Sequence, residues 1–166
     1  ESDYNYVGGI VGYISLNSIV SNSLSLGDVS STNSSSVGGI AGYNSSSTII
    51  NCYSTGDIQG KYAAVGGICG ECSGNVYYTY STGKITGEFR IGGLLGLYYS
   101  GEIKNNVAAN AKIFYNDPQY YHENGRVIGF DGSGTGIFEN NYAWNNLYIN
   151  DSIVTNGLIN NNQGQD

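Results

Sequence analysis

The chain of 166 residues has the length of one domain, which buries roughly two-thirds of its unfolded surface on folding. Charged residues make up 11% of the chain, where about a quarter is typical, and the net charge is −7 at pH 7. With only six Lys and Arg residues, binding to nucleic acid or to an anionic membrane surface is not expected. No apolar run approaches the roughly 18 residues that would insert into a bilayer.

The N-terminus carries neither a start Met nor a secretion signal. The first residue is Glu1, so we expect a processed product or a piece of a longer protein. Only six residues precede the first recognisable motif, too few for a substantial cap. We therefore expect the N-terminal edge either to continue upstream or to meet another molecule.

A glycine-rich phrase recurs along the chain. Its copies are Val7–Gly12, Val37–Gly42, Val65–Gly70 and Ile91–Gly96, with a degraded fifth copy at Gly125–Gly129. Measured from Gly8, successive copies are 30, 28, 26 and 33 residues apart. A regular spacing of this size is typical of solenoids and other repeat architectures.

A second phrase follows each copy of the first in the same order. It occupies Val20–Val29, Ile49–Ile58 and Val76–Ile85, with weaker copies at Ile103–Asn110 and Phe138–Ala143. Both phrases are short, rich in β-branched and aromatic residues, and bounded by Gly, Asn and Asp, which is typical of β-strands. A unit of this length cannot bury its apolar side alone, whereas stacked units can. The sequence therefore predicts an all-β parallel β-helix, or β-solenoid, of about five coils of 26–33 residues.

Stacking in register predicts which side chains lie above one another. Two aliphatic columns are expected, at Val7, Val37, Val65 and Ile91, and at Ile10, Ile40, Ile68 and Leu94. A ladder of hydrogen-bonded amides is expected at Asn22, Asn51, Asn105 and Asn140, with Tyr78 as its interruption. Arg126 replaces the second Gly in the last copy, which predicts that the stack ends there.

These paired phrases resemble the GLUG repeat, and the resemblance extends from Val7 to Ala143. The clearest matches are Gly66–Gly70 and Gly92–Gly96, with Asn51–Gly56 as the companion strand. The resemblance implies a β-solenoid of the kind found in secreted or surface-attached bacterial proteins, such as adhesins. It supplies no catalytic residues.

The C-terminal third departs from the repeat. Within the repeat region, residues 1–143, we expect an irregular insertion over residues 111–124, where Pro118 and His122 lie. Residues 144–166 are expected to form a cap, through Trp144, Leu147 and Tyr148, followed by a polar tail. A terminal coil needs such a cover because its unpaired edge otherwise invites association.

Three cysteines allow two interpretations. Cys69 and Cys72 have the spacing of a redox or half-metal motif, but the only further ligands, Cys52 and His122, belong to other coils. No metal and no cofactor is therefore expected. A disulfide between Cys52 and either Cys69 or Cys72 remains an alternative to buried free thiols that fill small-residue columns.

An enzyme acting on polysaccharides is the catalytic alternative, because parallel β-helices often act on polysaccharides. Such a site needs a cluster of carboxylates and basic residues on one face. Asp28 and Asp57 share a column with Lys84, which is an ordinary alternation of charge. The charged residues near turns are Glu88, Arg90, Glu102 and Lys104. Solvation explains them equally well, so we expect no catalytic residues.

Tyrosine is the most informative residue type for function, with 16 copies. The candidate binding surface comprises Tyr53, Tyr77, Tyr78, Tyr80, Tyr98 and Tyr99, with Tyr142 in the column of Tyr53 and Tyr80. Outward-facing tyrosines can stack on sugar rings, but stacked tyrosines also stabilise a sheet without any ligand.

The sequence as a whole favours a non-enzymatic repeat domain at the cell surface or outside the cell. We expect it to act as a structural scaffold, spacer or adhesion module, including assembly into filaments. Two partner classes remain open: self-association through the terminal coils, or a glycan or protein bound by a lateral face.

Overall fold

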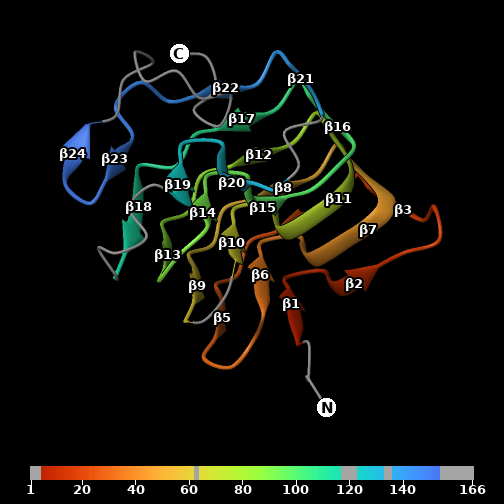
Figure 1. Ribbon diagram of the computed structural model, residues 1–166, viewed down its shortest axis with the longest axis horizontal. Coiled ribbons are helices and arrows are strands. Elements are labelled where there is room, and N and C mark those ends of the chain that lie inside the picture. The colour runs from red at the N-terminus through yellow and green to blue at the C-terminus, as the bar shows by residue number, and fades with distance from the viewer. Residues whose placement is uncertain (1–4, 62–63, 117–122, 133–135, 154–166) are drawn as a thin grey trace.

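A computed structural model describes residues 5–61, 64–116, 123–132 and 136–153. The predicted all-β parallel solenoid is confirmed, with four parallel sheets running along the stack. Figure 1 shows the strands of successive coils side by side, from β1 near the N-terminus to β24 near the C-terminus. No helix in these ranges is long and apolar enough to cross a membrane.

The first two sheets contain the glycine-rich phrase. Sheet A consists of β1 (Tyr6–Gly8), β6 (Ser36–Gly38), β10 (Ala64–Gly66), β14 (Ile91–Gly92) and β19 (Asn124–Gly125). Sheet B consists of β2 (Val11–Ile14), β7 (Ala41–Ile50), β11 (Cys69–Tyr77), β15 (Leu95–Tyr98) and β20 (Ile128–Asp131), joined by β3 (Ile19–Ser21), β16 (Glu102–Lys104) and β21 (Ile137–Glu139). From β1 to β19 the chain makes about four turns, and the later strands add part of another, against the roughly five predicted.

The other two sheets contain the second phrase. Sheet C consists of β4 (Leu24–Ser25), β8 (Tyr53–Ser54), β12 (Tyr80–Ser81), β17 (Val107–Ala108) and β22 (Tyr142–Ala143). Sheet D consists of β5 (Val29–Ser31), β9 (Ile58–Gly60), β13 (Ile85–Gly87), β18 (Lys112–Tyr115), β23 (Tyr148–Ile149) and β24 (Ser152–Ile153). The strands are two to four residues long in both sheets, because each coil turns a corner after each strand.

The glycine phrase makes the sharp corner between sheets A and B. A Cβ on Gly39 would collide with the Ser54 side chain and the Gly67 backbone, so only Gly fits there. A Cβ on Gly38 would likewise collide with the Ala41 carbonyl. The two consecutive glycines thus let neighbouring coils pack backbone against backbone.

The predicted aliphatic columns fill the interior. Val7 pairs with Val37, Val37 with Val65, and Val65 with Ile91 in the register of sheet A. In the second column Ile40, Ile68 and Leu94 are buried and Val127 continues the column, whereas the first predicted member, Ile10, is 46% exposed. Continuous apolar columns bury each coil against its neighbours, which supplies the main driving force for folding.

The region predicted as an insertion begins with a regular strand. Lys112–Tyr115 form β18, which pairs in parallel with β13 on one side and β23 on the other. The next coil already begins at Asn124 in β19. Pro118 and His122 lie outside the described residues.

The C-terminal end of the stack differs from its interior. β24 pairs with β23 in antiparallel orientation and so occupies the last edge of sheet D. Leu147, one of the residues expected in a cap, is fully buried and packs in the cluster that contains Ile113. Trp144 and Tyr148, by contrast, remain partly exposed, and the expected polar tail lies outside the described residues.

Candidate functional site

The outer face of sheet C carries one column of large uncharged side chains. The register pairs Leu24 with Tyr53, Tyr53 with Tyr80, Tyr80 with Val107, and Val107 with Tyr142. The predicted alignment of Tyr53, Tyr80 and Tyr142 is therefore confirmed. Their common neighbours Ser54, Ser81 and Ala108 point inward and are buried.

A second column follows two residues later along each of these strands. We call the two columns together the sheet C face; its members are Leu24, Leu26, Tyr53, Thr55, Tyr80, Thr82, Val107, Ala109, Tyr142 and Trp144. None of these ten side chains is charged. The sheet C face is therefore an uncharged, partly aromatic strip that runs the length of the stack.

The rings of Tyr53 and Tyr80 stack on each other. Their centroids are 4.7 Å apart and their planes differ by 5°. Each ring thus covers one face of the other, and that face is not available to a ligand. Sugar rings bind preferentially to exposed aromatic faces, so this pair favours the sheet-stabilising interpretation of the tyrosines.

The predicted amide ladder lies along one border of the sheet C face. Asn51 donates to Asn22 (3.4 Å) and Asn140 donates to Asn105 (3.0 Å) through their side-chain amides. Every residue of this column has a positive φ, between 50° and 59°, including Tyr78. Asn tolerates the left-handed region whereas Tyr does not, so Tyr78 is a strained interruption of the ladder.

A second, buried ladder runs just inside the first and was not predicted. The Asn106 side chain donates to the Asn141 side chain (2.9 Å) and to the Val76 carbonyl (3.0 Å). Its oxygen accepts bonds from the backbone and hydroxyl of Thr79, both at 2.9 Å. Thr79 occupies the equivalent position one coil before Asn106, and Cys52 occupies it two coils before. This column satisfies buried polar groups at the corner between sheets B and C.

The remaining predicted tyrosines do not form one surface. Tyr77 lies on β11 and donates from its hydroxyl to Glu102 at 2.9 Å. Tyr99 is exposed, but Tyr98 is fully buried, donates to the Gly101 carbonyl (2.7 Å) and packs edge-on against Phe138. Burial raises the pKa of Tyr98 to about 12. The prediction that Tyr98 belongs to an outer binding surface is therefore wrong.

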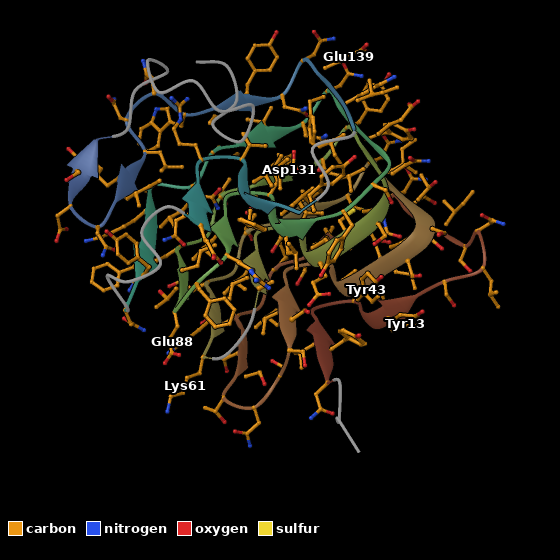
Figure 2. All side chains as sticks on the ribbon, viewed as in Figure 1. Tyr13, Tyr43, Lys61, Glu88, Asp131 and Glu139 are labelled. Carbon is orange, nitrogen blue, oxygen red and sulfur yellow. The ribbon has the colours of Figure 1, made fainter. Side chains whose placement is uncertain are left out.

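Sequence reasoning missed a tyrosine cluster on the first two coils. The ring centroids of Tyr6, Tyr13 and Tyr43 lie 5.2 to 5.6 Å from one another. Figure 2 labels Tyr13 and Tyr43 beside each other on β2 and β7. Both directly follow the last Gly of the glycine phrase, and this shared repeat position was the signal that could have revealed them.

Glu71 continues the column of Tyr13 and Tyr43 on the third coil. Its carboxylate accepts a hydrogen bond from the Ser36 hydroxyl at 2.6 Å. Burial raises the pKa of Glu71, while the Ser36 bond and the positive charge of Arg90 act in the opposite direction. Arg90 itself pairs with Glu123 at 3.0 Å. The column of Tyr13, Tyr43 and Glu71 thus changes from aromatic to charged side chains within three coils.

The three cysteines are free, buried thiols. Cys52 lies in the buried ladder, whereas Cys69 and Cys72 lie on β11. The structure thus does not contain the candidate disulfide between Cys52 and either of the others. Burial raises the pKa of the Cys69 thiol well above its usual value, so it is protonated at neutral pH.

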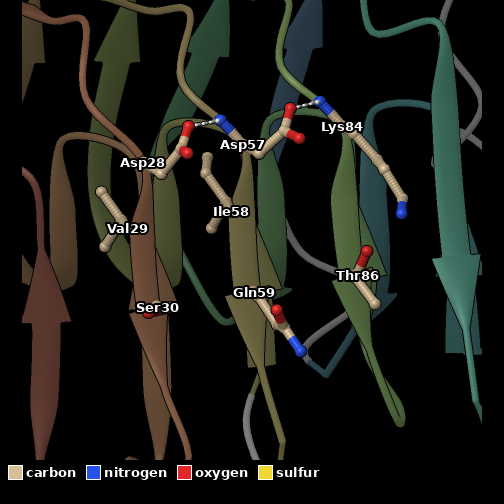
Figure 3. Close-up of a pocket in the computed structure, with 8 residues that line it drawn as sticks. All are labelled: Asp28, Val29, Ser30, Asp57, Ile58, Gln59, Lys84 and Thr86. Carbon is tan, nitrogen blue, oxygen red and sulfur yellow. Dashed lines mark hydrogen bonds between the residues drawn. The ribbon is translucent and has the colours of Figure 1, made fainter.

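The outer face of sheet D holds a pocket of about 270 Å³ between β5, β9 and β13 (Figure 3). The Asp28 carboxylate accepts a hydrogen bond from the Asp57 backbone (2.8 Å), and that of Asp57 accepts one from the Lys84 backbone (2.9 Å). Each carboxylate thus closes a backbone position of the next coil, which explains the recurrent Asp after Gly. The two carboxylates that line the pocket therefore serve the ladder.

Charged residues elsewhere form separate pairs. Lys104 bridges Glu102 (3.0 Å) and Glu139 (3.5 Å) on sheet B. The Lys104 hydrogen bond lowers the pKa of Glu102, which keeps it ionised at neutral pH. In Figure 2, Glu139 lies at the opposite end of the view from Lys61 and Glu88. Among the described residues, no three His, Cys, Asp or Glu side chains converge in the manner of a metal site.

Comparison with known protein families finds one match, which lies within the repeat region. Residues 33–59, which extend from the loop before β6 into β9, match the family described as the GLUG motif. The match covers one coil, and that coil contains the glycine phrase of β6–β7 and the Asp ladder of β9. No curated protein and no solved structure matches the chain.

Proposed function

Since this chain is a β-solenoid that carries the GLUG motif, we propose that it acts outside the cell as a non-enzymatic structural repeat domain. In this role it serves as a scaffold or spacer, or as an adhesion module within a surface structure. The proposal includes display at the cell surface or secretion. The GLUG resemblance and the scarcity of surface charge support this location.

Continuous interactions along the axis carry the proposal. Each coil is bound to the next by parallel strands in four sheets, by apolar columns and by hydrogen-bonded Asn and Asp ladders. In such a stack each unit contacts only its neighbours, so length is set by the number of coils. A body of this kind holds two points at a fixed separation.

The arrangement of charges supports a non-enzymatic role. Polysaccharide hydrolysis needs two carboxyl groups separated by roughly 5 to 10 Å around a substrate groove, one of them with a raised pKa. The carboxylate whose pKa burial raises, Glu71, is engaged by Ser36 and lies beside tyrosine rings. Asp28 and Asp57 are engaged as backbone acceptors.

Rigidity along the axis is the property to test. Ser21 and Glu139 are exposed ends of one column, separated by four coil steps, or about 19 Å. Nitroxide labels on the double variant S21C/E139C should give one narrow distance distribution by pulsed electron paramagnetic resonance. The unsubstituted chain is the control, since its buried cysteines should take up no label. A broad distribution would contradict a scaffold role.

The same protein should release no reducing ends from a panel of plant, bacterial and animal polysaccharides. Measurable release that follows the protein through purification would overturn the non-enzymatic part of the proposal. The label distances would be unaffected by that result, so the two parts can fail separately.

A lateral binding role is the second candidate, and the sheet C face is the observation that favours it. Contiguous uncharged side chains of this kind are typical of protein contacts. The mutual stacking of Tyr53 and Tyr80 favours a protein partner over a glycan. Trp144, the only tryptophan of the chain, lies on this face and reports on it by fluorescence. A saturable Trp144 response to a soluble oligosaccharide, lost in Tyr80→Ser, would show glycan binding instead.

A further inference from the structure

The outer face of sheet D carries charges of opposite sign on its two halves. The register of β5, β9, β13 and β18 aligns Asp28, Asp57, Lys84 and Lys112 in one row, just before or at the start of these strands. In this row the coils of β5 and β9 are acidic, and those of β13 and β18 are basic. The row lies on the lateral surface of the stack, so further coils at either end would extend this face without covering it.

A second row lies at the other border of the sheet, where the same four strands end. It consists of Thr32, Lys61, Glu88 and Asn116. Figure 2 labels Lys61 and Glu88 at this border, on neighbouring coils. The two middle coils therefore carry a positive and then a negative charge here, which is the reverse of their order in the first row.

The opposite charges of the first row do not neutralise each other within the chain. The Asp57 carboxylate accepts a hydrogen bond from the Lys84 backbone (2.9 Å), whereas the Lys84 ammonium lies 5.8 Å from the centroid of the Phe114 ring. Figure 3 shows this ammonium directed away from the carboxylate. The Lys112 ammonium lies 5.2 Å from the same ring and pairs with the exposed Asp151. Asp57 and Lys84 can thus each take an ionic partner from outside the chain.

The charge pattern becomes its own complement when a second copy is turned over. A two-fold axis parallel to the strands keeps the strand direction and reverses the order of the coils, so β9 faces the partner's β13 and β5 faces the partner's β18. The facing pairs, each present twice, are Asp57 with Lys84, Asp28 with Lys112, and Lys61 with Glu88. Every charge of the two rows then lies opposite one of the other sign. A two-fold axis along the stack would instead place Asp28 and Lys112 opposite uncharged residues.

The shape of the middle row agrees with this arrangement. Between the two charged rows lie Ser30, Gln59, Thr86 and Phe114, and we call the three rows together the sheet D face. The pocket between β5, β9 and β13 includes Ser30, whereas Phe114 is the one large apolar side chain of this row. Reversal of the coil order places Phe114 opposite the partner's Ser30, at the pocket. An aromatic side chain seated in a hollow of the partner is typical of an interface anchor.

We propose that the sheet D face binds the sheet D face of a second copy of this chain, with the two stacks running in opposite directions. Such an isologous contact uses the same surface on both copies and therefore gives a closed dimer. Four coils of five residues cover roughly 19 by 16 Å, or about 300 Å² per copy. A standard interface buries about 800 Å² per partner, so this dimer is weak and depends on its ion pairs. The inference rests on the structural role proposed above and specifies its partner.

Sedimentation equilibrium of the whole chain, up to about 1 mM, tests the dimer through an exchange of charges. Lys84→Asp places two carboxylates opposite each other and leaves the backbone donor of the ladder in place, so the dissociation constant should rise at least tenfold. The double variant D57K/K84D restores opposite charges across the two-fold axis and should return to within about threefold of the parent. Lys104→Asp changes the net charge equally on sheet B and is the matched control.

A second exchange avoids the ladder, in case Asp57→Lys impairs folding. Glu88→Lys should weaken the dimer, and the double variant K61E/E88K should restore it. Raising the salt concentration from about 0.1 M to about 1 M shortens the Debye length from about 10 Å to about 3 Å and should weaken the parent dimer at least threefold.

Three results would overturn the inference: a monomer at every concentration, a dimer unaffected by Lys84→Asp, or losses that neither double variant recovers. The last would show that the copies meet in another orientation. Labels on S21C/E139C lie on sheet B, away from this face, and dilution with unlabelled protein makes their distance independent of association. A narrow label distribution together with a monomer would therefore reject the dimer and retain the scaffold role.

Discussion

Arg126 reaches across the last coil to the carbonyl of Ala143, which accepts its hydrogen bond at 2.9 Å. In each earlier coil a glycine takes the place of Arg126, namely Gly9, Gly39, Gly67 or Gly93. A side chain at those positions would collide with the coil above, so a large residue is possible only where no coil follows. The buried Arg126 therefore belongs to the end of the stack, as its replacement of Gly predicted.

Replacing Arg126 with Met should lower the free energy of unfolding by about 2 kcal/mol. The Met side chain keeps most of the volume but leaves the buried Ala143 carbonyl without its donor, a loss of about 1 to 3 kcal/mol. Urea unfolding followed by circular dichroism measures the change. Lys112→Met, which removes an exposed ion pair with Asp151, is the control and should cost less than about 1 kcal/mol. Equal losses in both variants would contradict the closing role of Arg126.

Truncating Asn106 to Ala should cost about 3 kcal/mol. The change leaves the Val76 carbonyl, the Asn141 oxygen and the Thr79 donors without their buried partner. Asn105→Ala removes a neighbouring amide from the outer ladder, where water can replace the lost bond, and should cost about 1 kcal/mol or less. Chemical unfolding of both variants compares how much free energy of unfolding the buried and the outer ladder contribute. A larger loss for Asn105 would contradict this account.

Replacing Tyr78 with Asn should stabilise the protein by about 1 kcal/mol. Tyr78 is 58% exposed and has a φ of 52°, so the change relieves backbone strain while losing little packing. The new amide also completes the ladder between Asn51 and Asn105. Tyr78→Val is the opposing control, since a β-branched residue tolerates this region least. Thermal unfolding should rank Asn above Tyr and Tyr above Val, and any other order would argue against strain at this position.

Two glycines should respond very differently to alanine. A Cβ on Gly39 would meet the Gly67 backbone and the Ser54 side chain, so Gly39→Ala should cost at least about 3 kcal/mol or prevent folding. A Cβ on Gly27 would meet nothing within 4 Å, so Gly27→Ala should change stability by less than about 0.5 kcal/mol. The yield of soluble protein and the melting temperature separate the two outcomes. A tolerated Gly39→Ala would mean that adjacent coils are farther apart than described.

Glu71 should make stability depend on pH in a defined direction. Because burial raises its pKa in the folded state, the folded protein binds this proton more tightly than the unfolded chain, whose Glu pKa is about 4.3. The protonated Glu71 therefore contributes its full stabilisation at pH values below the unfolded pKa, and this contribution is lost as the pH rises through the folded pKa. Glu71→Gln should melt at a higher temperature than the parent at pH 7, and the difference should shrink toward pH 4. A difference independent of pH would contradict this assignment.

The repeat made most of the fold predictable. Matching phrases defined the strands, their parallel register and the columns of Val, Ile, Asn and Tyr, because a stack in register places like positions above each other. The number of turns was less certain, since the degraded last copy does not show where the stack stops. Lys112–Tyr115 resemble no earlier phrase, although they occupy the same strand position as Ile85–Gly87.

The surface was harder to predict than the core. Tyr98 and Tyr99 are adjacent, so one must point inward and the other outward, and the sequence alone does not decide which. Tyr6 joins Tyr13 and Tyr43 only because the double glycine folds sheet A against sheet B. Contacts across that corner depend on three-dimensional geometry rather than on repeat position.

The shared register of the inner coils bears on how such a protein can change during evolution. The coils that start at β6 and β10 present the same kinds of side chain on their upper and lower edges. A gene duplication that inserted one more such coil between them would preserve every neighbour-to-neighbour contact. The molecule would lengthen by about 4.8 Å, and neither Arg126 nor the first coil would change its surroundings. The number of inner coils can therefore change without altering the contacts of the coils on either side.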